Sequence, residues 1–476
     1  MKKFVAMLLA AAMVLALAAC GSAEPAEQAA APAATVGNTE APTIETKAAE
    51  EVQSEAAASA EKDYSGRTLK LIMSIGGGGN WWQPVADRMM ELYPGLNVEV
   101  TFDSNADQIL RTEYLAGEAA DAFMINSNKI PRYQAIEQGL VQPIDYVLSL
   151  PTLQGDKTLG EVMDLSVFSK GAYDGHYYCM HEFQYLDGFW YDAKFFRDNN
   201  LTIPETWDDF VKLGEECKAL GIPAVGYMGI AASEYANEYW FIPMLASTDY
   251  QAYVQYQNLD PEVWHSDAMK RTVEKLGYVR DNDLFDKKTL GTTATETQIA
   301  FINHDFAIYP CGSWLEPEMA DAWTEDWELT YLPYSFGETA DQKYMMMGGQ
   351  ESMITSSTKE NLDLVGEFYR VLFSDEEAMK EVVKTHQNVM LVPNFSERFG
   401  DLVAPSVNTA AAAMEYMNKI NSPASSWYPD INTMVGDAMN AFFNGDITEE
   451  EFLQRGFDEF TRIQNDSSVT KYKFEG

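Results

Sequence analysis

DGHYYCMHEFQYLDGFWYDAKFFRDNNLTIPETWDDFVKLGE, residues 174–215, contains the signals that decide the fold of this chain. Asp174-Gly175 is a turn signal, and the aromatic-rich run 176–192 that follows it favours a β-strand. A capped helix comes next, because Thr206 is placed to accept a hydrogen bond from a free backbone N–H and Asp209 to return one. The stretch therefore predicts a turn, a long aromatic strand and a helix in close succession.

Strand and helix patterns alternate in the chain ahead of this stretch. Residues 68–75 form a near-continuous apolar run, which is typical of a parallel strand covered on both faces. Pro84 suits the first turn of a helix, and a second helix is expected to end at Gly117. With further strands at 96–102 and 121–126, the β-α-β-α-β pattern predicts a doubly wound lobe.

The loops that follow these strands are the expected ligand site. In parallel sheets of this kind, ligands bind beyond the carboxyl ends of the strands. The strands here end in the loops 76–82, 103–105 and 126–128. This physical argument alone selects Asn80, Trp81, Trp82, Asn126 and Asn128.

Capped helices are predicted in the second half of the chain. Ser374 with Glu377, and Thr448 with Glu451, have the spacing of capping boxes. The helix after Thr448 is expected to bury the stripe Leu453, Phe457 and Phe460.

The first 20 residues have the composition of a bacterial lipoprotein signal peptide. Lys2-Lys3 precedes an apolar run that is too short to span a membrane, and residues 17–20, Leu-Ala-Ala-Cys, look like a lipobox. We expect an acylated Cys20 to anchor the protein to the cell membrane on its extracytoplasmic side; the alternative is a plain secretory signal with an incidental cysteine. Residues 21–62 contain no aromatic residue, and their Ala, Glu, Pro, Ser and Thr content predicts a disordered tether.

Composition and charge exclude several classes of partner. The formal net charge of −40 argues against binding of nucleic acid or anionic lipid. Beyond Cys20, the remaining cysteines are Cys179, Cys217 and Cys311, an odd and widely spaced set that forms no disulfide framework. Three buried thiols are expected, although a Cys179–Cys311 pair stays open.

Four short segments resemble the family 1 extracellular solute-binding proteins, the sugar-capturing components of bacterial ABC importers. Residues 189–192, Phe-Trp-Tyr-Asp, and 204–208, Pro-Glu-Thr-Trp-Asp, match the family's lobe-crossing strand and the helix start behind it. Residues 299–314 look like the segment that returns the chain to the first lobe, although His304-Asp305 stands where Gly-Lys is usual. Residues 348–351 look like a third crossing.

The resemblance implies an α/β fold of the type II periplasmic-binding-protein-like class, with two lobes and a ligand cleft between them. It places the N-terminal lobe at 63–181 and 305–348, and the C-terminal lobe at 182–304 and 349–476. In this family the hinge closes around a sugar, and the closed protein docks on an ABC permease. We expect a monomer of this kind.

The sequence contains no complete catalytic motif. His181-Glu182 has no second histidine at zinc-protease spacing, and the glycines 76–79 lack the Gly-Lys-Ser/Thr of a phosphate-binding loop. We therefore predict a binding protein with no enzymatic activity, no metal and no cofactor. A secreted carbohydrate-active enzyme, and an adhesin or sensor of the same fold, are the alternatives.

Sugar recognition has a recognisable residue chemistry. Aromatic rings cover the apolar faces of a neutral sugar, and amides and carboxylates pair with its hydroxyls. A ligand of N-acetylglucosamine type is the first expectation, and other neutral oligosaccharides fit almost as well. The further candidate contacts are Glu182, Tyr227, Tyr239, Trp240, Trp314, Glu316, Gln350, Glu351, Trp427 and Tyr428.

Overall fold

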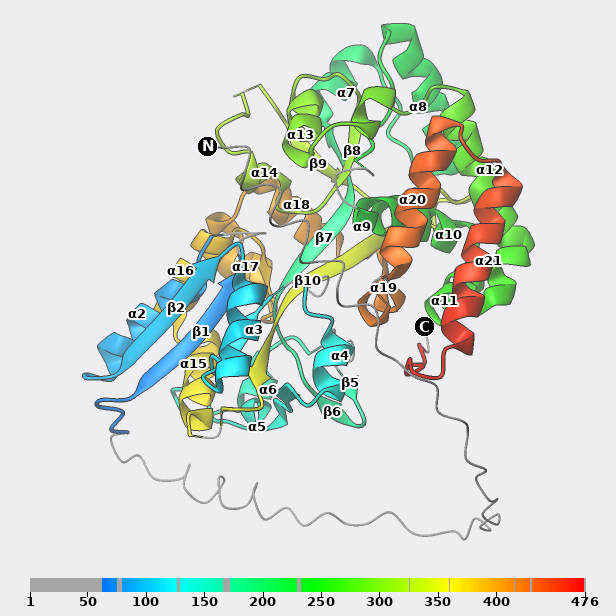
Figure 1. Ribbon diagram of the computed structural model, residues 1–476. Helices are drawn as coiled ribbons and strands as arrows, with labels where there is room; N and C mark the ends of the chain where they lie inside the picture. Colours follow the sequence, from blue (N-terminus) through cyan, green and yellow to red (C-terminus); the bar gives the residue numbers. More distant parts are fainter. Residues whose placement is uncertain are drawn as a thin grey trace, which may run out of the picture. The chain divides into compact units, whose positions relative to one another are not determined.

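The computed structural model describes residues 62–74, 79–125, 129–165, 172–228, 233–324, 326–358, 360–414, 416–428 and 430–474 (Figure 1). The predicted signal peptide with Cys20 lies outside the described residues, as do Asn126, Asn128 and the side chain of Gln350. Within the described ranges, each helix is too short or too polar to cross a bilayer.

The first three strands form the predicted parallel sheet, in the order β3-β1-β2. Side chains alternate across β1: Leu71 and Met73 point to the side of α2, while Ile72 packs with the residues of α3 on the other face. The two helices therefore cover opposite faces, as a doubly wound lobe requires. The bounds are β1 (Thr68–Ser74), α2 (Trp82–Leu92), β2 (Asn97–Asp103), α3 (Ala106–Ala116) and β3 (Ala122–Met124).

Two long antiparallel strands, β7 (Met180–Asp192) and β10 (Tyr344–Thr355), run side by side through the centre of Figure 1. β10 also pairs with β3, so it joins the first sheet to β7. The far half of β7 instead pairs with β8 (Ile308–Cys311) and β9 (Leu329–Leu332). The strand predicted from the aromatic run is confirmed. Its first part pairs with β10 and its last part with β8 and β9, so β7 connects the two sets of strands.

Three hydrophobic cores organise the described residues. The α2 core contains Trp81 and Trp82 and packs α2 against α15 (Leu362–Ser374) and α16 (Glu376–His386). The α3 core, with Leu110, lies on the opposite face of β1. The α21 core contains Trp240 and the buried residues of α21 (Glu449–Asn465). We refer to the part built on the α2 and α3 cores as the first lobe, and to the part built on the α21 core as the second lobe.

The packing favours lobe boundaries that differ from those predicted. Residues 362–386 form α15 and α16, which lie against α2 in the first lobe, whereas the sequence placed everything after 349 in the second. Residues 332–344 contribute to the α21 core and not to the first lobe. We propose that the chain passes between the lobes on β7, β8 and β10.

The remaining helices and strands belong to one lobe or the other or connect them. In the first lobe they are α4 (Arg132–Glu137), β4 (Val141–Gln142), α5 (Asp145–Leu148), α6 (Leu159–Val162), β5 (Ala172–Tyr173), β6 (His176–Tyr177), α15 (Leu362–Ser374), α16 (Glu376–His386), β11 (Val389–Met390), α17 (Phe395–Phe399) and α18 (Pro405–Ala413). Around the α21 core they are α8 (Trp207–Leu220), α9 (Ser233–Ala236), the π-helical segment η2 (Asn237–Phe241), α10 (Ile242–Thr248), α11 (Tyr250–Gln257), α12 (Asp267–Asp281), α19 (Pro423–Trp427), α20 (Asp430–Asn444) and α21 (Glu449–Asn465). The connecting elements are α7 (Ala193–Asn199), α13 (Ala294–Ile302), α14 (Leu315–Glu318) and β12 (Asn418–Ile420).

Most helix signals in the sequence are confirmed. Thr206 caps α8 by accepting from the backbone N–H of Asp209 at 3.2 Å, and Thr448 and Glu451 form the predicted capping box of α21. The box predicted at Ser374 is wrong. Asp375 caps α16 instead, since a carboxylate one residue later reaches two backbone N–H groups, while the Ser374 hydroxyl donates to a carbonyl of the preceding helix.

His304, the departure from the family pattern, adopts a left-handed conformation with φ of 58°. Glycine reaches that region at no steric cost, and histidine reaches it less easily. Its ring is stacked between Phe195 at 4.3 Å and Trp327 at 4.5 Å, and Nε2 lies 3.0 Å from Asp192 Oδ2. These contacts offset the backbone cost at the point where β7 ends.

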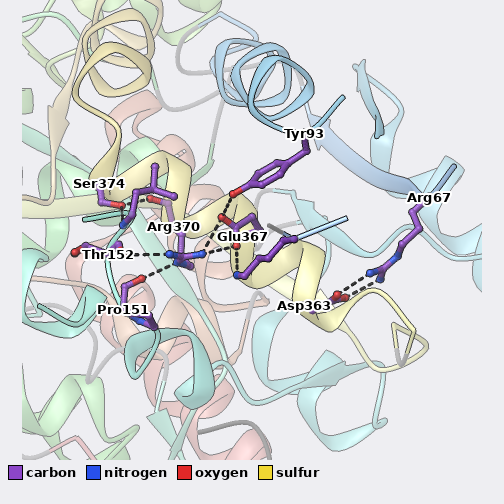
Figure 2. Close-up of polar contacts among 10 residues, drawn as sticks. Arg67, Tyr93, Pro151, Thr152, Asp363, Glu367, Arg370 and Ser374 are labelled. Atoms are coloured by element: carbon purple, nitrogen blue, oxygen red, sulfur yellow. Dashed lines mark hydrogen bonds and ion pairs between the residues drawn. The ribbon is translucent and has the colours of Figure 1, made fainter. Parts of the chain in front are cut away.

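A buried ion cluster fixes the first lobe around Glu367, which is 1% exposed. Its carboxylate accepts hydrogen bonds from Lys62 Nζ at 2.6 Å, from Arg370 at 2.6 and 2.9 Å, and from the Tyr93 hydroxyl. Arg370 also donates to the carbonyl of Pro151 (Figure 2). Burial opposes ionisation of Glu367, but the donors outweigh it and lower its pKa.

The three cysteines beyond Cys20 are buried free thiols, as expected, and Cys179 and Cys311 are not bonded to each other.

Candidate functional site

A row of aromatic rings runs from the first lobe to the second. The Trp81 indole stacks on the His386 imidazole at 5.5 Å, and the His386 ring lies 5.8 Å from the Tyr185 ring. Tyr185 contacts Trp314 edge to face at 4.9 Å, and Trp314 lies 6.3 Å from Tyr239. We call these five residues the aromatic row. They come from the loop before α2, the end of α16, β7, the residue before α14, and η2, so elements far apart in sequence converge here.

Trp314 lies between Tyr185 and Tyr239 in the row. It is half-buried and packs against both the α2 core and the α21 core. Its ring lies so close over Gly312 that a Cβ at residue 312 would come within 1.9 Å of the indole. The glycine two residues before the tryptophan is therefore required for this ring position.

The second-lobe end of the row lies on a π-helical segment. Tyr239 belongs to η2 and stacks on Tyr235 of α9 at 4.4 Å, with an interplanar angle of 11°. π-Helical turns inside α-helices occur frequently at functional sites. Beside them the Glu238 carboxylate accepts from Asn432 Nδ2 at 3.1 Å, and burial raises the pKa of Glu238 to about 7.

A carboxylate lies next to the rings. Asp187 is 2% exposed on β7, two residues beyond Tyr185. After burial itself, its charge is the next largest cause that raises the pKa of Tyr185 and of Tyr239. Across the strand pair, a Cβ at Gly348 would lie 2.9 Å from Asp187 Oδ2, so glycine leaves the room that this carboxylate occupies.

Several polar atoms along the first-lobe side of the row have no hydrogen-bond partner among the described residues. They include both ring nitrogens of His386, which is 1% exposed, and Oδ1 of Asn80. Burial lowers the pKa of His386 to about 3, so its ring is neutral at physiological pH. An imidazole in that state offers one donor and one acceptor to a ligand hydroxyl or amide.

The structure distributes the residues that the sequence selected over three environments. Trp81 and Trp314 lie in the aromatic row together with Tyr239, and Asn80 lies next to Trp81. Trp427 is half-buried at a second contact between the lobes. The other selected residues that the structure describes are in cores or in polar pairs that the protein itself provides, and Trp81 is itself fully buried in the α2 core.

Trp82, Tyr227 and Trp240 are fully buried in hydrophobic cores. The Tyr227 hydroxyl donates to Asn440 Oδ1 at 2.9 Å. Tyr428, 7% exposed, donates to the carbonyl of Thr470 at 2.8 Å. Such packing favours a structural role for these four aromatic residues.

The predicted carboxylates are also engaged within the protein. Glu182 is 0% exposed and accepts from the Ser352 hydroxyl, and burial raises its pKa well above the ordinary value. Glu316 accepts from the backbone N–H of Ser406 at 3.0 Å, at the start of α18. Glu351 forms an ion pair with Arg132 and lies 3.4 Å from His181 Nδ1.

Four site residues were missed by the sequence reasoning: Tyr185, Asp187, Tyr235 and His386. Tyr185 and Asp187 carried a usable signal, because alternate residues of a lobe-crossing strand share a face. His386 carried none, since its position follows from how α16 packs on α2. Among the described residues, no group of three or more His, Cys, Asp or Glu side chains is arranged to hold a metal ion.

The fold is that of a two-lobed binding protein, and the aromatic row is the candidate for its ligand site. A profile of the family described as bacterial extracellular solute-binding protein matches residues 74–379, and the chain belongs to this family.

Named relatives and solved structures agree with that assignment. The diacetylchitobiose-binding protein NgcE of Streptomyces coelicolor is 22% identical over 271 residues, which span 56% of each chain. A solute-binding protein, RafE, in complex with raffinose has a TM-score of 0.64 at 18% identity and covers 83% of this chain and 99% of its own. A chitin oligosaccharide binding protein has a TM-score of 0.65 at 18% identity, with 83% and 98% covered. At these identities the structural likeness shows the fold.

Proposed function

We propose that this protein captures a sugar or short oligosaccharide between its two lobes, with N-acetylglucosamine units as the preferred kind, and delivers it to the permease of an ABC importer. The observation that carries the proposal is the aromatic row. Rings from both lobes meet there beside the Asp187 carboxylate, and the neutral His386 imidazole has no hydrogen-bond partner among the described residues.

This combination suits a sugar better than a charged or wholly apolar ligand. The rings provide surfaces for the C–H faces of a pyranose, and polar groups at their edges pair with hydroxyls. An acetamido group adds one donor, one acceptor and a methyl group, for which an imidazole edge beside an indole is a matching partner. Two of the named relatives bind chitin-derived sugars, which supports the N-acetylglucosamine preference.

The test is isothermal titration calorimetry of the chain with N,N′-diacetylchitobiose, N-acetylglucosamine, raffinose and maltose. We expect the chitobiose to bind with micromolar affinity or better and the sugars without acetamido groups to bind more weakly. Binding of raffinose alone would keep the carbohydrate class and remove the N-acetylglucosamine preference. Absence of heat with all four sugars would remove the carbohydrate proposal.

The same titrations separate binding from catalysis. Chromatography of the sugars after incubation should return them unchanged. Appearance of a shorter sugar would instead favour a carbohydrate-active enzyme.

We also propose that the protein acts as a monomer on a lipid anchor at Cys20, a residue outside the described ranges. Cys20→Ala should release the protein from the membrane fraction of expressing cells and abolish labelling by a fatty-acid analogue. Retention in the membrane fraction would contradict the anchor.

A further inference from the structure

The segment that follows α21, residues 466–474, lies along the second lobe, and we call it the strap. The Tyr428 hydroxyl donates to the carbonyl of Thr470 at 2.8 Å. Farther along, Asn258 and Phe474 exchange two hydrogen bonds of 2.8 Å, in which the Asn258 side chain donates to the Phe474 carbonyl and accepts from its backbone N–H. The strap is thus fixed to the second lobe on both sides of Tyr472.

The Tyr472 ring reaches from the strap to the first lobe. Its centroid lies 4.3 Å from that of Tyr133 in α4 and 5.9 Å from that of Tyr173 in β5. On the second-lobe side it lies 5.1 Å from Trp427 and 6.4 Å from Tyr428. One side chain therefore contacts aromatic rings of both lobes.

Few partly buried side chains among the described residues contact the hydrophobic cores of both lobes. Within the described ranges, the partly buried hydrophobic side chains that pack against cores of both lobes are Trp314, Trp427 and Tyr472. Trp314 belongs to the aromatic row. Trp427 and Tyr472 contact each other and the first-lobe residue Tyr133, and none of these three is part of a lobe-crossing strand.

We propose that the strap is a latch, in which the Tyr472 ring holds the lobes together and so prolongs the capture of ligand without touching it. This inference rests on the proposed function. Ligand between two lobes is released when they separate, and separation must break the contacts of Tyr472 with Tyr133 and Tyr173. A latch that favours the binding-competent arrangement raises the apparent affinity in proportion to the population of that arrangement. The latch is a positioning device, and its effect is expected mainly in the dissociation rate.

The binding test compares Tyr472→Ala, Tyr472→Phe and Tyr416→Ala, with N,N′-diacetylchitobiose as the probe. Tyr472→Ala should weaken affinity about tenfold, or about 1.4 kcal/mol, through faster dissociation in stopped-flow traces. Tyr472→Phe keeps the ring and should retain the affinity. Tyr416 is 72% exposed and serves as the matched control, whose replacement should change nothing.

A second measurement needs no sugar. Spin labels on Leu115→Cys and Leu220→Cys report the distance between the lobes, since Leu115 is 91% and Leu220 44% exposed on α3 and α8. The labels are placed in the full chain with Cys20→Ala, where the other cysteines are buried. Tyr472→Ala should lengthen and broaden the distance distribution, and Tyr472→Phe should not.

The two measurements distinguish the failure of each proposal. Absence of sugar binding in the unmodified protein, together with an altered distance distribution in Tyr472→Ala, would remove the proposed ligand and keep the latch. An unchanged distance distribution in Tyr472→Ala would overturn the latch, even where the affinity falls together with the melting temperature, because that pattern reports a loss of stability only.

Discussion

Glu367 and His386 are both buried polar side chains of the first lobe, and their surroundings are opposite. Every oxygen of the Glu367 carboxylate accepts hydrogen bonds from cations or a phenol of the protein (Figure 2). Neither ring nitrogen of His386 has such a partner among the described residues.

We propose that this difference, together with the place of His386 in the aromatic row, marks His386 as a group with which a ligand can pair. A buried polar group without a hydrogen bond costs stability, so proteins rarely retain one for structural purposes. The Glu367 cluster is complete without any other molecule. The His386 ring has no such set of partners among the described residues, and we propose that a ligand hydroxyl or amide pairs with it.

The largest expected effect is on the complete cluster. Glu367→Ala leaves the buried Arg370 without its counter-ion and should lower the free energy of unfolding by about 3–5 kcal/mol in urea denaturation. The control is Asp363→Ala, which removes an exposed ion pair to Arg67 and should cost less than about 1 kcal/mol. Equal losses in the two variants would contradict the structural role of the cluster.

The next effect is the pH dependence of stability that His386 causes. The pKa of His386 is lowered by burial from 6.5 to about 3, so below pH 6.5 the unfolded chain binds a proton that the folded chain does not. Above pH 6.5 the neutral His386 ring therefore does not lower the free energy of unfolding, and this free energy decreases as pH falls below 6.5. Unfolding free energies should drop by about 2 kcal/mol more in the unmodified protein than in His386→Phe when pH falls from about 6.5 to about 5. Parallel pH profiles for the two proteins would contradict this, because they would mean that the His386 ring takes up its proton as readily in the folded chain as in the unfolded chain.

Trp314→Ala should weaken sugar binding at least tenfold, a loss of about 1.4 kcal/mol or more, because it removes the ring of the row that packs against the cores of both lobes. Calorimetry measures this effect, and thermal unfolding checks that the variant is folded. Trp207→Ala is the matched control, since Trp207 is also half-buried against the α21 core but stacks on Phe210, outside the row. Affinity unchanged in Trp314→Ala would remove this residue from the site.

The smallest expected effect concerns Glu238, a carboxylate of the second lobe, and the pH dependence of stability that it causes. The pKa of Glu238 is raised by burial from 4.5 to about 7, so the folded chain keeps a proton that the unfolded chain loses, and stability falls as pH rises through this window. This sign is opposite to that of His386. Between about pH 5 and about pH 6, Glu238→Gln should remove a stability loss of about 1 kcal/mol, measured in urea denaturation. Identical slopes for variant and unmodified protein would contradict it.

The sequence predicted the fold more completely than the site. Apolar periodicity and caps identified β1, α2, β2, α3 and β7, because these signals are local. Trp314 and Tyr239, selected for their residue chemistry, lie in the aromatic row, and their contact with ligand stays a prediction. Trp81, Trp82 and Trp240 were selected from loop position or residue chemistry, and the structure buries all three, because a tryptophan can turn toward the core as readily as toward a ligand.

Long-range packing accounts for what the sequence did not predict. His386 lies in the row only because α16 packs against α2, and Tyr472 reaches Tyr133 only because the strap crosses the second lobe. The lobe boundaries have the same origin, since the residues of α15 carry no mark of the lobe in which they lie.

The position of Lys62 in the Glu367 cluster has a mechanical consequence. Lys62 is only a few residues ahead of β1, which pairs in parallel with both β2 and β3. Tension applied to the chain from the side of residue 61 would meet the Lys62 ion pair first. It would then act along β1, where the hydrogen bonds to both neighbours share the load in shear. The first-lobe sheet would bear a pull of this kind before the crossing strands did, so the pull would change the distance between the lobes last.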